Sequence, residues 1–459
     1  MNLPSDFIER TKPLLKENWE TFLSALNNES PVSIRLNKNK AICSNDLNVN
    51  RVPWCDLGYY LPERPQFTFD PLFHAGCYYV QEASSMFVYQ ALKQYAERDL
   101  KILDLCAAPG GKSTLIADFM TDNSLLVSNE VIRSRANILS ENITKWGNPN
   151  VVVSNNDPSA FNNMKHYFDV ILVDAPCSGE GMFRKDVGAI EEWSVDNVKL
   201  CAERQRRILS DVWDSLKPNG ILIYSTCTYN TEENEDNVLW IKDNLGAEIL
   251  PLEIEKEWGI SPSVKDNIPV YRFFPHKTKG EGFFLAVLRK NDDEIHTFRG
   301  KKEKNKAKSK DILSKDYKDY VDLSDSFHYY QRSEDWYAIP NVFKEDVSLL
   351  GFCLNIISSG IKIGEIKGKD FIPAQSLAMS NFINRKAFTE YELDWKTAIL
   401  YLKREPLVLP DTPKGYILLT YKNTPLGFVK NIGNRANNLY PQEWRIRSNY
   451  LPDGEESVL

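Results

Sequence analysis

The stretch Val170-Ile-Leu-Val-Asp174-Ala-Pro176-Cys177-Ser-Gly-Glu-Gly-Met-Phe-Arg-Lys185 decides the fold. Its first four residues are all apolar, which is typical of a strand buried on both faces of a parallel sheet. The run stops at Asp174, and Pro176 lacks the N–H that a central strand must donate, so the chain leaves the sheet here. Ligands of open α/β sheets bind just beyond the carboxyl ends of the strands. We therefore expect Asp174 and Cys177 at the rim of a ligand site.

A second thiol follows another apolar run. Residues 221–225 are mostly apolar, and Thr226-Cys227-Thr228 comes directly after them. Each cysteine alone could be a small buried hydrophobic residue, which is a common role of a free thiol. Because two thiols lie at two strand ends, with the Asp174 carboxylate beside one of them, a catalytic role is favoured instead.

The other cysteines and the histidines give no sign of a metal site. The chain has eight cysteines without a Cys-x-x-Cys pair, and its five histidines are scattered. This spacing argues against a zinc ribbon or a disulfide framework. We therefore expect no metal, and we expect Cys43, Cys201 and Cys353 to be buried and unreactive.

Length and composition indicate a globular protein with several domains. The chain has 459 residues, and its 42% hydrophobic and 26% charged fractions are ordinary for a soluble protein. No signal-peptide pattern is visible, and no apolar run approaches the roughly 18 residues that span a bilayer, so we expect a cytoplasmic protein without a membrane partner. The net charge of −7 argues weakly against nucleic-acid binding, but charges are screened over about 8 Å, so local basic patches outweigh the total.

From about residue 100 onward, short apolar runs alternate with helical patterns. We expect strands at 101–105, 125–127, 151–153, 170–173, 221–225, 247–252 and 282–288, and helices at 112–121, 131–146 and 196–216. Such alternation predicts an α/β fold with a doubly wound sheet and helices on both faces. The last two strands are expected to form an antiparallel pair.

The N-terminal region predicts a small module of its own. Residues 5–27 carry an amphipathic helical pattern that Pro13 is expected to divide into two helices. Residues 32–37 alternate like a half-exposed strand, and residues 52–75 indicate a packed irregular segment with short strands. Residues 1–75 are therefore interpreted as an α+β (RRM-like) module.

The C-terminal third predicts a linker and two further domains. A basic run at 299–310 is expected to be a solvated linker or an arm that touches phosphates. Residues 371–383 indicate a strand end followed by a helix, and residues 416–429 indicate a hairpin. The predicted division of the chain is 1–75, 76–290, 291–318, 319–395 and 396–459.

The loop after the first expected strand of the sheet resembles a phosphate-binding P-loop, but it lacks an essential residue. A P-loop needs glycine five positions before its Gly-Lys pair, and this position is Cys106. The Gly-x-Gly-x-x-Gly fingerprint of dinucleotide sites is absent as well. The loop therefore argues against an ATPase or a nicotinamide enzyme.

What remains is a set of groups that suit S-adenosylmethionine. The small-residue turn lets backbone approach a ligand and leads into a helix N-terminus that favours a carboxylate. Glu130, at the next strand end, is placed to hold ribose hydroxyls, and Asp157 could accept from an adenine amino group. Each acid alone could simply cap the following helix. The expected cofactor-binding residues are Cys106, Ala107, Ala108, Pro109, Gly110, Gly111, Lys112, Glu130, Asp157 and Asp174.

The thiols suit methylation of cytosine at carbon 5, which is a poor nucleophile. A thiolate that adds to carbon 6 turns the ring into an enamine and makes carbon 5 reactive. The reaction needs the thiolate, an acid at ring nitrogen 3, and a way to lose the carbon 5 proton before sulfur is eliminated. Cys227, Asp174 and Cys177 could supply these functions.

These motifs resemble the RNA cytosine-5 methyltransferases of the Sun/Fmu group. The resemblance is carried by residues 106–112, by the segments 174–181 and 225–235, and by the N-terminal segments Ser33–Asn37 and Gln81–Met86. The segments 371–380, 430–438 and 443–446 resemble the bacterial RsmF (YebU) branch of that family. Membership implies a Rossmann-like class I methyltransferase core, a PUA-like last domain, and 16S rRNA or the small ribosomal subunit as the partner.

The resemblance also implies roles for single residues. Cys227 would attack the base and Cys177 would assist release of the methylated base, so both are expected to be catalytic. Asp174 would hold the cytosine edge, with Lys112 orienting it. Arg135 is a weaker cofactor candidate, because a surface arginine is an equal alternative. Arg184 and Lys185 are candidates for phosphate contacts, unless they are ordinary solvated charges.

Three alternatives stay open at this point. The same core could methylate tRNA, although the C-terminal third disfavours this. DNA cytosine methyltransferases attack with the Pro-Cys thiol, which here would be Cys177. A non-catalytic ribosome-binding factor could have kept the fold, but the acid, both thiols and the cofactor loop argue against it.

Overall fold

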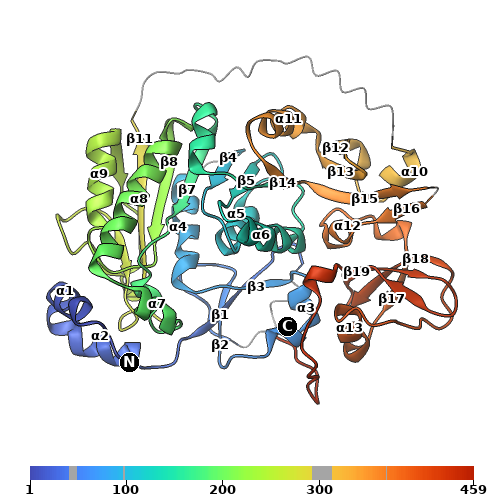
Figure 1. Cartoon of the computed structure of the whole chain (residues 1–459), viewed down its shortest axis with the longest axis horizontal. Helices are drawn as coiled ribbons and strands as arrows, with labels where there is room; N and C mark the ends of the chain where they lie inside the picture. Colours follow the sequence, from blue (N-terminus) through green and yellow to red (C-terminus); the bar gives the residue numbers. More distant parts are fainter. Residues whose placement is uncertain (41–48, 97–98, 292–312, 369) are drawn as a thin grey trace.

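The computed structural model describes residues 1–40, 49–96, 99–291, 313–368 and 370–459. A nine-stranded sheet forms its centre, in the order β10-β11-β8-β7-β4-β5-β6-β14, with β9 paired to β11 (Figure 1). The parallel strands are β4 (Lys101–Asp104), β5 (Leu125–Asn129), β6 (Val151–Ser154), β7 (Phe168–Asp174) and β8 (Leu216–Thr226). The chain winds from β4 outward in one direction and from β7 outward in the other. The strand order therefore reverses between β4 and β7, where open α/β sheets bind ligands.

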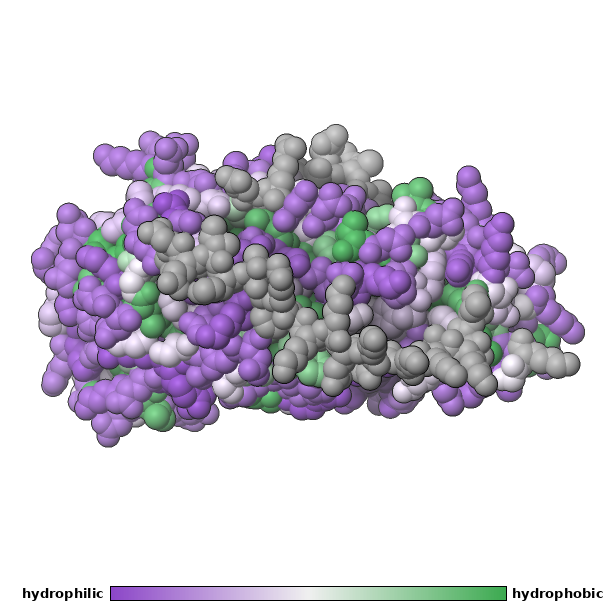
Figure 2. Space-filling view, turned by 90° about the horizontal axis from the view of Figure 1, so that it is seen from above, coloured by the Kyte–Doolittle hydropathy of each residue, from purple (hydrophilic) through white to green (hydrophobic). Residues whose placement is uncertain are grey.

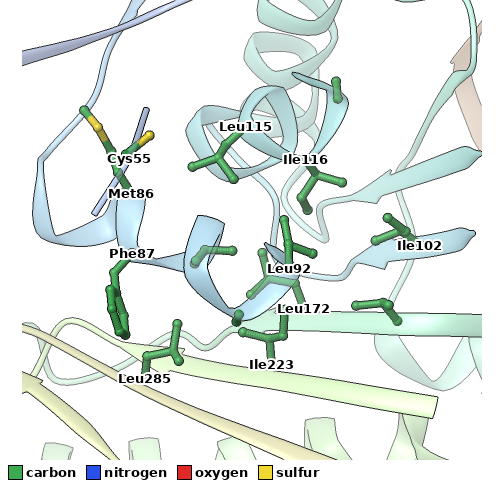
Figure 3. Close-up of a cluster of buried hydrophobic side chains, with 14 of the residues drawn as sticks. Cys55, Met86, Phe87, Leu92, Ile102, Leu115, Ile116, Leu172, Ile223 and Leu285 are labelled. Atoms are coloured by element: carbon green, nitrogen blue, oxygen red, sulfur yellow. The ribbon is translucent and has the colours of Figure 1, made fainter. Parts of the chain in front are cut away.

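Side chains of the strands point alternately to two cores. On β7, Val170 and Leu172 belong to one core, whereas Ile171 and Val173 belong to the other. Helices α4 (Val88–Tyr95), α5 (Gly111–Phe119) and α6 (Arg133–Trp146) cover the first face, where Leu92 packs beside the strands (Figure 3). Helices α8 (Val195–Trp213), α9 (Glu235–Leu245) and α11 (Lys344–Cys353) cover the second face. The predicted doubly wound sheet with helices on both faces is confirmed.

The sheet edges include strands that the sequence patterns did not predict. The predicted antiparallel pair of β9 (Ala247–Leu250) and β11 (Phe283–Lys290) is confirmed, and β10 (Tyr271–Phe273) extends this edge. At the other edge, β14 (Ile356–Ser359) from the C-terminal third pairs antiparallel with β6. Periodicity could not reveal this pairing, because the partners are distant in the chain and only tertiary packing brings them together.

The N-terminal module contains two helices and a three-stranded sheet. Helix α1 (Ser5–Leu15) continues through Pro13, so the prediction that Pro13 divides the helices is wrong. The break comes at Lys16, which has a left-handed φ of 50° and starts a single turn before α2 (Trp19–Leu26). The sheet has the order β2-β1-β3, with β1 (Val32–Leu36), β2 (Gly58–Leu61) and β3 (Tyr78–Val80).

Strand β1 is more buried than its alternating pattern predicts. Four of its five residues are buried, including Ser33 and Arg35. Arg35 reaches toward the helices that cover the central sheet, where it pairs with Asp118 of α5. An ion pair across the interface lets a charged side chain occupy a buried position.

The C-terminal third contains two four-stranded sheets. The first is formed by β12 (Phe327–Arg332), β13 (Asp335–Pro340), β15 (Ile361–Lys367) and β16 (Asp370–Pro373), followed by α12 (Gln375–Met379). The second is formed by β17 (Thr389–Glu392), β18 (Gly415–Tyr421), β19 (Thr424–Asn431) and β20 (Ala436–Asn438), with α13 (Trp395–Leu402) beside it. The predicted hairpin is the β18–β19 pair, and its turn residues Lys422 and Asn423 have positive φ values of 46° and 59°. The basic run at 299–310 lies outside the described residues.

The last domain and the N-terminal module share one hydrophobic core. Ile399 and Leu402 of α13 belong to the same cluster as Ile34 and Tyr78 of the N-terminal sheet. The indole of Trp395 donates to the carbonyl of Phe69 at 2.9 Å. The two ends of the chain therefore pack against each other.

The surface is dominated by hydrophilic side chains. The face in Figure 2 shows only small, separated hydrophobic patches between them. Over the described ranges, no helix has both the length and the apolar character that a membrane crossing requires.

Candidate functional site

Three loops converge at the carboxyl ends of β4, β7 and β8. The loop after β4 carries residues 105–110, the loop after β7 carries Cys177, and the loop after β8 carries Cys227. They meet because β7 is hydrogen-bonded to β4 on one side and to β8 on the other. The structure therefore brings together the two thiols and the Asp174 carboxylate, as the strand-end argument predicts.

The two thiols are in direct contact. The Sγ atoms of Cys177 and Cys227 lie 3.1 Å apart, and the backbone N–H of Cys227 points at the sulfur of Cys177 at 3.4 Å. The hydrogen bond to Cys227 and burial raise the pKa of Cys177 well above its usual value. Two neighbouring thiolates would repel each other, so Cys177 is favoured as the protonated thiol.

Asp174 is held between a lysine and a hydroxyl group. The ammonium of Lys112 lies 2.8 Å from Oδ2, and the hydroxyl of Ser225 donates to Oδ1 at 2.7 Å. Burial alone would lower the pKa of Lys112, but the carboxylate of Asp174 outweighs it, and the charge of Cys227 acts in the same direction, so the pKa is raised. Lys112 therefore stays charged beside both the acid and the thiol.

The loop after β4 forms the entrance to α5. Gly110 has a φ of 117°, which favours glycine, and an added Cβ there would lie 3.3 Å from the side chain of Leu139. Below the loop, Asp104 accepts from the hydroxyl of Ser113 at 2.6 Å, and burial raises its pKa to about 7. The second oxygen of Asp104 is buried and has no hydrogen-bond partner.

Glu130 and Arg135 form one unit with this loop. Glu130 is 2% exposed and accepts from the backbone of Ile132 at 2.9 Å. Arg135 lies 3.4 Å from the Glu130 carboxylate and donates to the carbonyl of Ala108 at 2.9 Å. Arg135 therefore contacts the cofactor loop and is not simply a free surface arginine.

Asp157 caps the N-terminus of the short helix at Pro158–Asn163, which is one of the two roles predicted for it. Its carboxylate accepts from the backbone and the hydroxyl of Ser159 at 3.1 and 2.7 Å, and these bonds lower its pKa. Arg207 lies 3.9 Å away. The side chain of Asp157 is half-exposed and lies just after the end of β6.

Arg184 is not available for the phosphate contact considered above. Its side chain is 6% exposed, pairs with the buried Glu281 at 3.0 Å, and donates to the carbonyls of Ala25 and Gly280. Lys185 lies 3.8 Å from the same carboxylate. That expectation is wrong for Arg184, because the guanidinium joins the N-terminal helices to the core.

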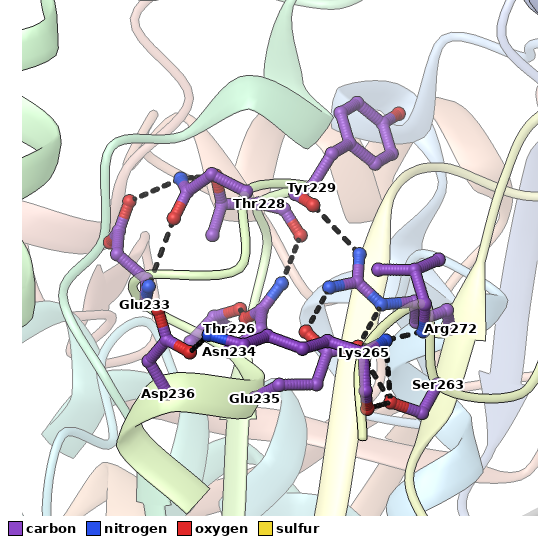
Figure 4. A network of polar contacts seen from close by, with 12 residues as sticks. Thr226, Thr228, Tyr229, Glu233, Asn234, Glu235, Asp236, Ser263, Lys265 and Arg272 are labelled. Carbon is purple, nitrogen blue, oxygen red and sulfur yellow. Dashed lines mark hydrogen bonds and ion pairs between the residues drawn. The ribbon is translucent and has the colours of Figure 1, made fainter. Parts of the chain in front are cut away.

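Buried polar residues behind the thiols were missed by the sequence reasoning. Glu180 accepts from the backbone N–H groups of Tyr229 and Asn230 at 2.8 Å each, so it ties the two thiol loops together. Figure 4 shows the continuation of this network, in which Arg272 pairs with Glu235 and donates to the carbonyl of Tyr229. The available signal was the density of acids and amides at 228–235, a segment that sequence alone places in a solvated loop.

The remaining candidates behave as structural residues. Cys201 is buried and Cys353 is partly buried, whereas Cys43 lies outside the described residues. Within the described ranges, no group of three histidine, cysteine or carboxylate side chains could hold a metal ion.

The donor set of the site fits S-adenosylmethionine. The helix N-terminus after the glycine turn suits the carboxylate of the cofactor. The buried Oδ1 of Asp104 has no hydrogen-bond partner within the protein, so it could accept a hydrogen bond from a bound ligand. Glu130 offers a buried carboxylate at the neighbouring strand end. Fold and site together define an S-adenosylmethionine-dependent methyltransferase.

Comparison with known proteins gives the family. A family model described as 16S rRNA methyltransferase RsmB/F matches residues 90–289, the N-terminal domain of 16S rRNA methyltransferase RsmF matches 3–83, and the methyltransferase RsmF PUA domain matches 388–446. Ribosomal RNA small subunit methyltransferase F of Vibrio parahaemolyticus is 31% identical over 96% of this chain and 97% of its own length. The Enterobacter sp. protein of the same name is 30% identical over 96% of this chain and 95% of its own. The chain belongs to the family of ribosomal RNA small subunit methyltransferase F.

Solved structures agree with the fold. A methyltransferase homolog protein from Pyrococcus horikoshii is 31% identical, covers 62% of this chain and 94% of its own, and superposes with a TM-score of 0.54. NSun6 from the same organism was solved with SFG, an analogue of S-adenosylmethionine. It is 24% identical, covers 63% of this chain and 99% of its own, and has a TM-score of 0.55, which shows the shared fold.

Proposed function

We propose that this protein methylates carbon 5 of a cytosine in 16S rRNA, within the small ribosomal subunit or its RNA. The observation that carries the proposal is the pair of thiols 3.1 Å apart beside the Lys112–Asp174 ion pair. A single-thiol enzyme would not need the second sulfur, whereas attack and later release of a base need two groups. The names of the relatives supply the target RNA, and action on ribosomal RNA supports the proposal that the protein is cytoplasmic.

Cys227 is the proposed nucleophile. The Lys112 ammonium favours negative charge on Cys227, because their interaction raises the pKa of Lys112. The thiolate adds to carbon 6 of cytosine, and the electron pair of the double bond becomes available at carbon 5. S-adenosylmethionine, when bound, supplies the methyl group that carbon 5 takes up.

Asp174, Lys112 and Cys177 complete the proposed mechanism. Asp174 is the acid at the cytosine edge: it gives nitrogen 3 a proton as the thiolate attacks and takes this proton back when the thiolate is expelled. Lys112 and Ser225 fix the orientation of that carboxylate. Cys177 lies against Cys227 and assists the last stage. Its thiolate takes the carbon 5 proton, the C5–C6 double bond returns, and the S–C6 bond breaks with its electron pair on the sulfur of Cys227.

The proposed cofactor site consists of Cys106, Ala107, Ala108, Pro109, Gly110, Gly111, Lys112, Glu130, Asp157 and Asp174. Arg135 is added to this set because it bridges Glu130 and Ala108. The division at 75, 290, 318 and 395 is kept as a proposal for domains, although β3 at 78–80 completes the N-terminal sheet and extends that module.

Bisulfite sequencing of RNA from cells with and without the gene tests the proposal. We expect one or more cytosines of 16S rRNA to lose protection in the deletion strain and to regain it with the wild-type gene. Loss confined to tRNA would keep the chemistry and change the substrate. No loss in any RNA would favour a ribosome-binding factor without activity.

A further inference from the structure

The peptide on both sides of Cys177 is held by one buried pair of side chains. The amide of Gln205, from the middle of α8, donates to the carbonyl of Pro176 at 3.0 Å and to the carboxylate of Glu233 at 2.7 Å. The same carboxylate accepts from the backbone N–H of Ser178 at 3.0 Å. Gln205 and Glu233 are fully buried. The residues before and after Cys177 are therefore both anchored to the Gln205–Glu233 pair.

The pair also joins this loop to the loop of Cys227. Glu233 lies in the second loop, where the amide of Asn230 donates to its carboxylate at 2.8 Å. The hydroxyl of Tyr224 lies 2.9 Å from the Gln205 oxygen and 2.6 Å from the carbonyl of Glu233, just before the strand reaches Cys227. A shift of either side chain would change the spacing of the two sulfurs.

We propose that the Gln205–Glu233 pair positions Cys177 against Cys227 and keeps it from acting as the nucleophile. The inference rests on the proposed function, because it concerns the division of labour between the two thiols. Its geometric basis is that Gln205 holds the carbonyl before Cys177 and Glu233 holds the N–H after it.

The charges around the thiols support this division. After the hydrogen bond to Cys227, burial and the charge of Cys227, the carboxylate of Glu233 further raises the pKa of Cys177. Burial raises the pKa of Glu233 itself, while bonds from Ser178 and Asn230 oppose the shift. The negative charge of Glu180, on the loop of Cys177, acts on Glu233 in the same direction as burial. Cys177 is thus favoured as a protonated thiol, which is a poor nucleophile.

Alkylation of the full-length protein with limiting iodoacetamide tests the charge effect. Alkylation reports the thiolate fraction, and mass mapping of peptides separates Cys177 from Cys227. We expect Glu233→Gln to raise the initial rate at Cys177 by about tenfold at pH 8, because one neighbouring negative charge is removed. The matched control is Glu180→Gln, which changes another buried carboxylate of the same loops but leaves both anchors of Cys177 in place. Equal labelling patterns in the two variants would overturn the inference.

Gln205→Met tests positioning without a change of charge. With unmethylated small subunits from the deletion strain, we expect the covalent RNA adduct to form within about threefold of the wild-type rate and to decay at least about tenfold more slowly. Equal slowing of both steps would indicate a general structural defect and contradict the inference. Binding of S-adenosylmethionine shows which variants are folded. If only one of Glu233→Gln and Gln205→Met folds, that variant alone is sufficient to test the inference. If the wild-type protein formed no adduct, the proposed function itself would fail, whereas an unchanged adduct and labelling pattern in the variants would refute only this inference.

Discussion

At the scale of single residues, the site separates two chemically identical thiols by their surroundings. Cys227 interacts electrostatically with the Lys112 ammonium. Cys177 is hydrogen-bonded to Cys227 and is influenced by the carboxylate of Glu233. Opposite charges near two groups of the same kind are enough to give them different protonation states. The order of events in the proposed reaction follows from this difference.

The first prediction concerns these two thiols. Cys227→Ala should abolish the covalent complex with RNA, because the attacking sulfur is gone, whereas Cys177→Ala should let the complex accumulate, because release fails. Gel shift under denaturing conditions measures both. Loss of the complex in Cys177→Ala, with persistence in Cys227→Ala, would assign attack to the Pro-Cys thiol instead.

The second prediction concerns the buried Asp104. Burial raises its pKa to about 7, above the value near 4 of an unfolded chain, so its contribution to stability is present below about pH 4 and is lost as the pH rises through about 7. Asp104→Asn removes this dependence. We expect the stability of the variant relative to wild type to rise by about 3 kcal/mol from pH 5 to pH 8, because wild type loses about 1.4 kcal/mol per pH unit until the buried carboxyl ionises near pH 7. Urea unfolding without cofactor at both pH values checks this, and a constant difference would contradict it.

At the scale of elements, the two thiol loops are locked by close backbone contacts. The N–H of Gly181 donates to the carbonyl of Cys227 at 2.8 Å. A Cβ on Gly181 would lie 2.5 Å from the oxygen of Gly282 and 2.8 Å from that of Cys227. The short glycine contact therefore sets the distance between the loop after β7 and the loop after β8.

The third prediction follows from this contact. Gly181→Ala should push the loops apart and cost about 1–3 kcal/mol of stability, because the clash is with backbone. We expect a fall in kcat of at least about tenfold with nearly unchanged affinity for S-adenosylmethionine, because the atoms nearest the added Cβ belong to Gly282 and Cys227 and not to the proposed cofactor site. The control is Gly351→Ala on α11, where an added Cβ meets nothing within 4 Å. Equal activity of both variants would count against the role of the contact.

At the scale of the whole molecule, the C-terminal domains are structural partners of the core and of the N-terminus. Strand β14 extends the central sheet beside β6, and the N–H of Asn381 donates to the carbonyl of Gly147 at the end of α6. Helix α13 contacts α3 (Pro71–His74) and shares a core with residues of β1, β2 and β3, whereas α1 and α2 lie on the opposite side of the molecule (Figure 1). The last domain is thus held in a fixed relation to the central sheet.

The fourth prediction compares two neighbours on α13. Ile399 is fully buried in the shared core, whereas Leu400 is 40% exposed. Ile399→Ala should lower the free energy of unfolding by about 2–5 kcal/mol, and Leu400→Ala should change it by about 0.5 kcal/mol or less. Thermal unfolding of the full chain measures both. Equal small effects would show that the last domain does not stabilise the N-terminal module.

The sequence by itself determined the sheet and the candidate site. Continuous apolar runs that end in Asp174 and Cys227 identify buried parallel strands, and such strands necessarily bring their carboxyl ends to one rim. The residues at those strand ends, including the glycine turn before Lys112, could therefore be predicted to form a site from the sequence alone.

Only the tertiary structure decided the contacts between distant segments. The β14–β6 pairing, the core shared by the two ends of the chain, the Arg184–Glu281 pair and the buried Gln205–Glu233 pair each join segments whose own patterns do not specify a partner. From the sequence alone, a polar side chain in a loop or on a helix is predicted to be exposed to solvent. Only tertiary packing can bury it. Its hydrogen-bond partners are then fixed by which surfaces meet, and that is a property of the whole fold.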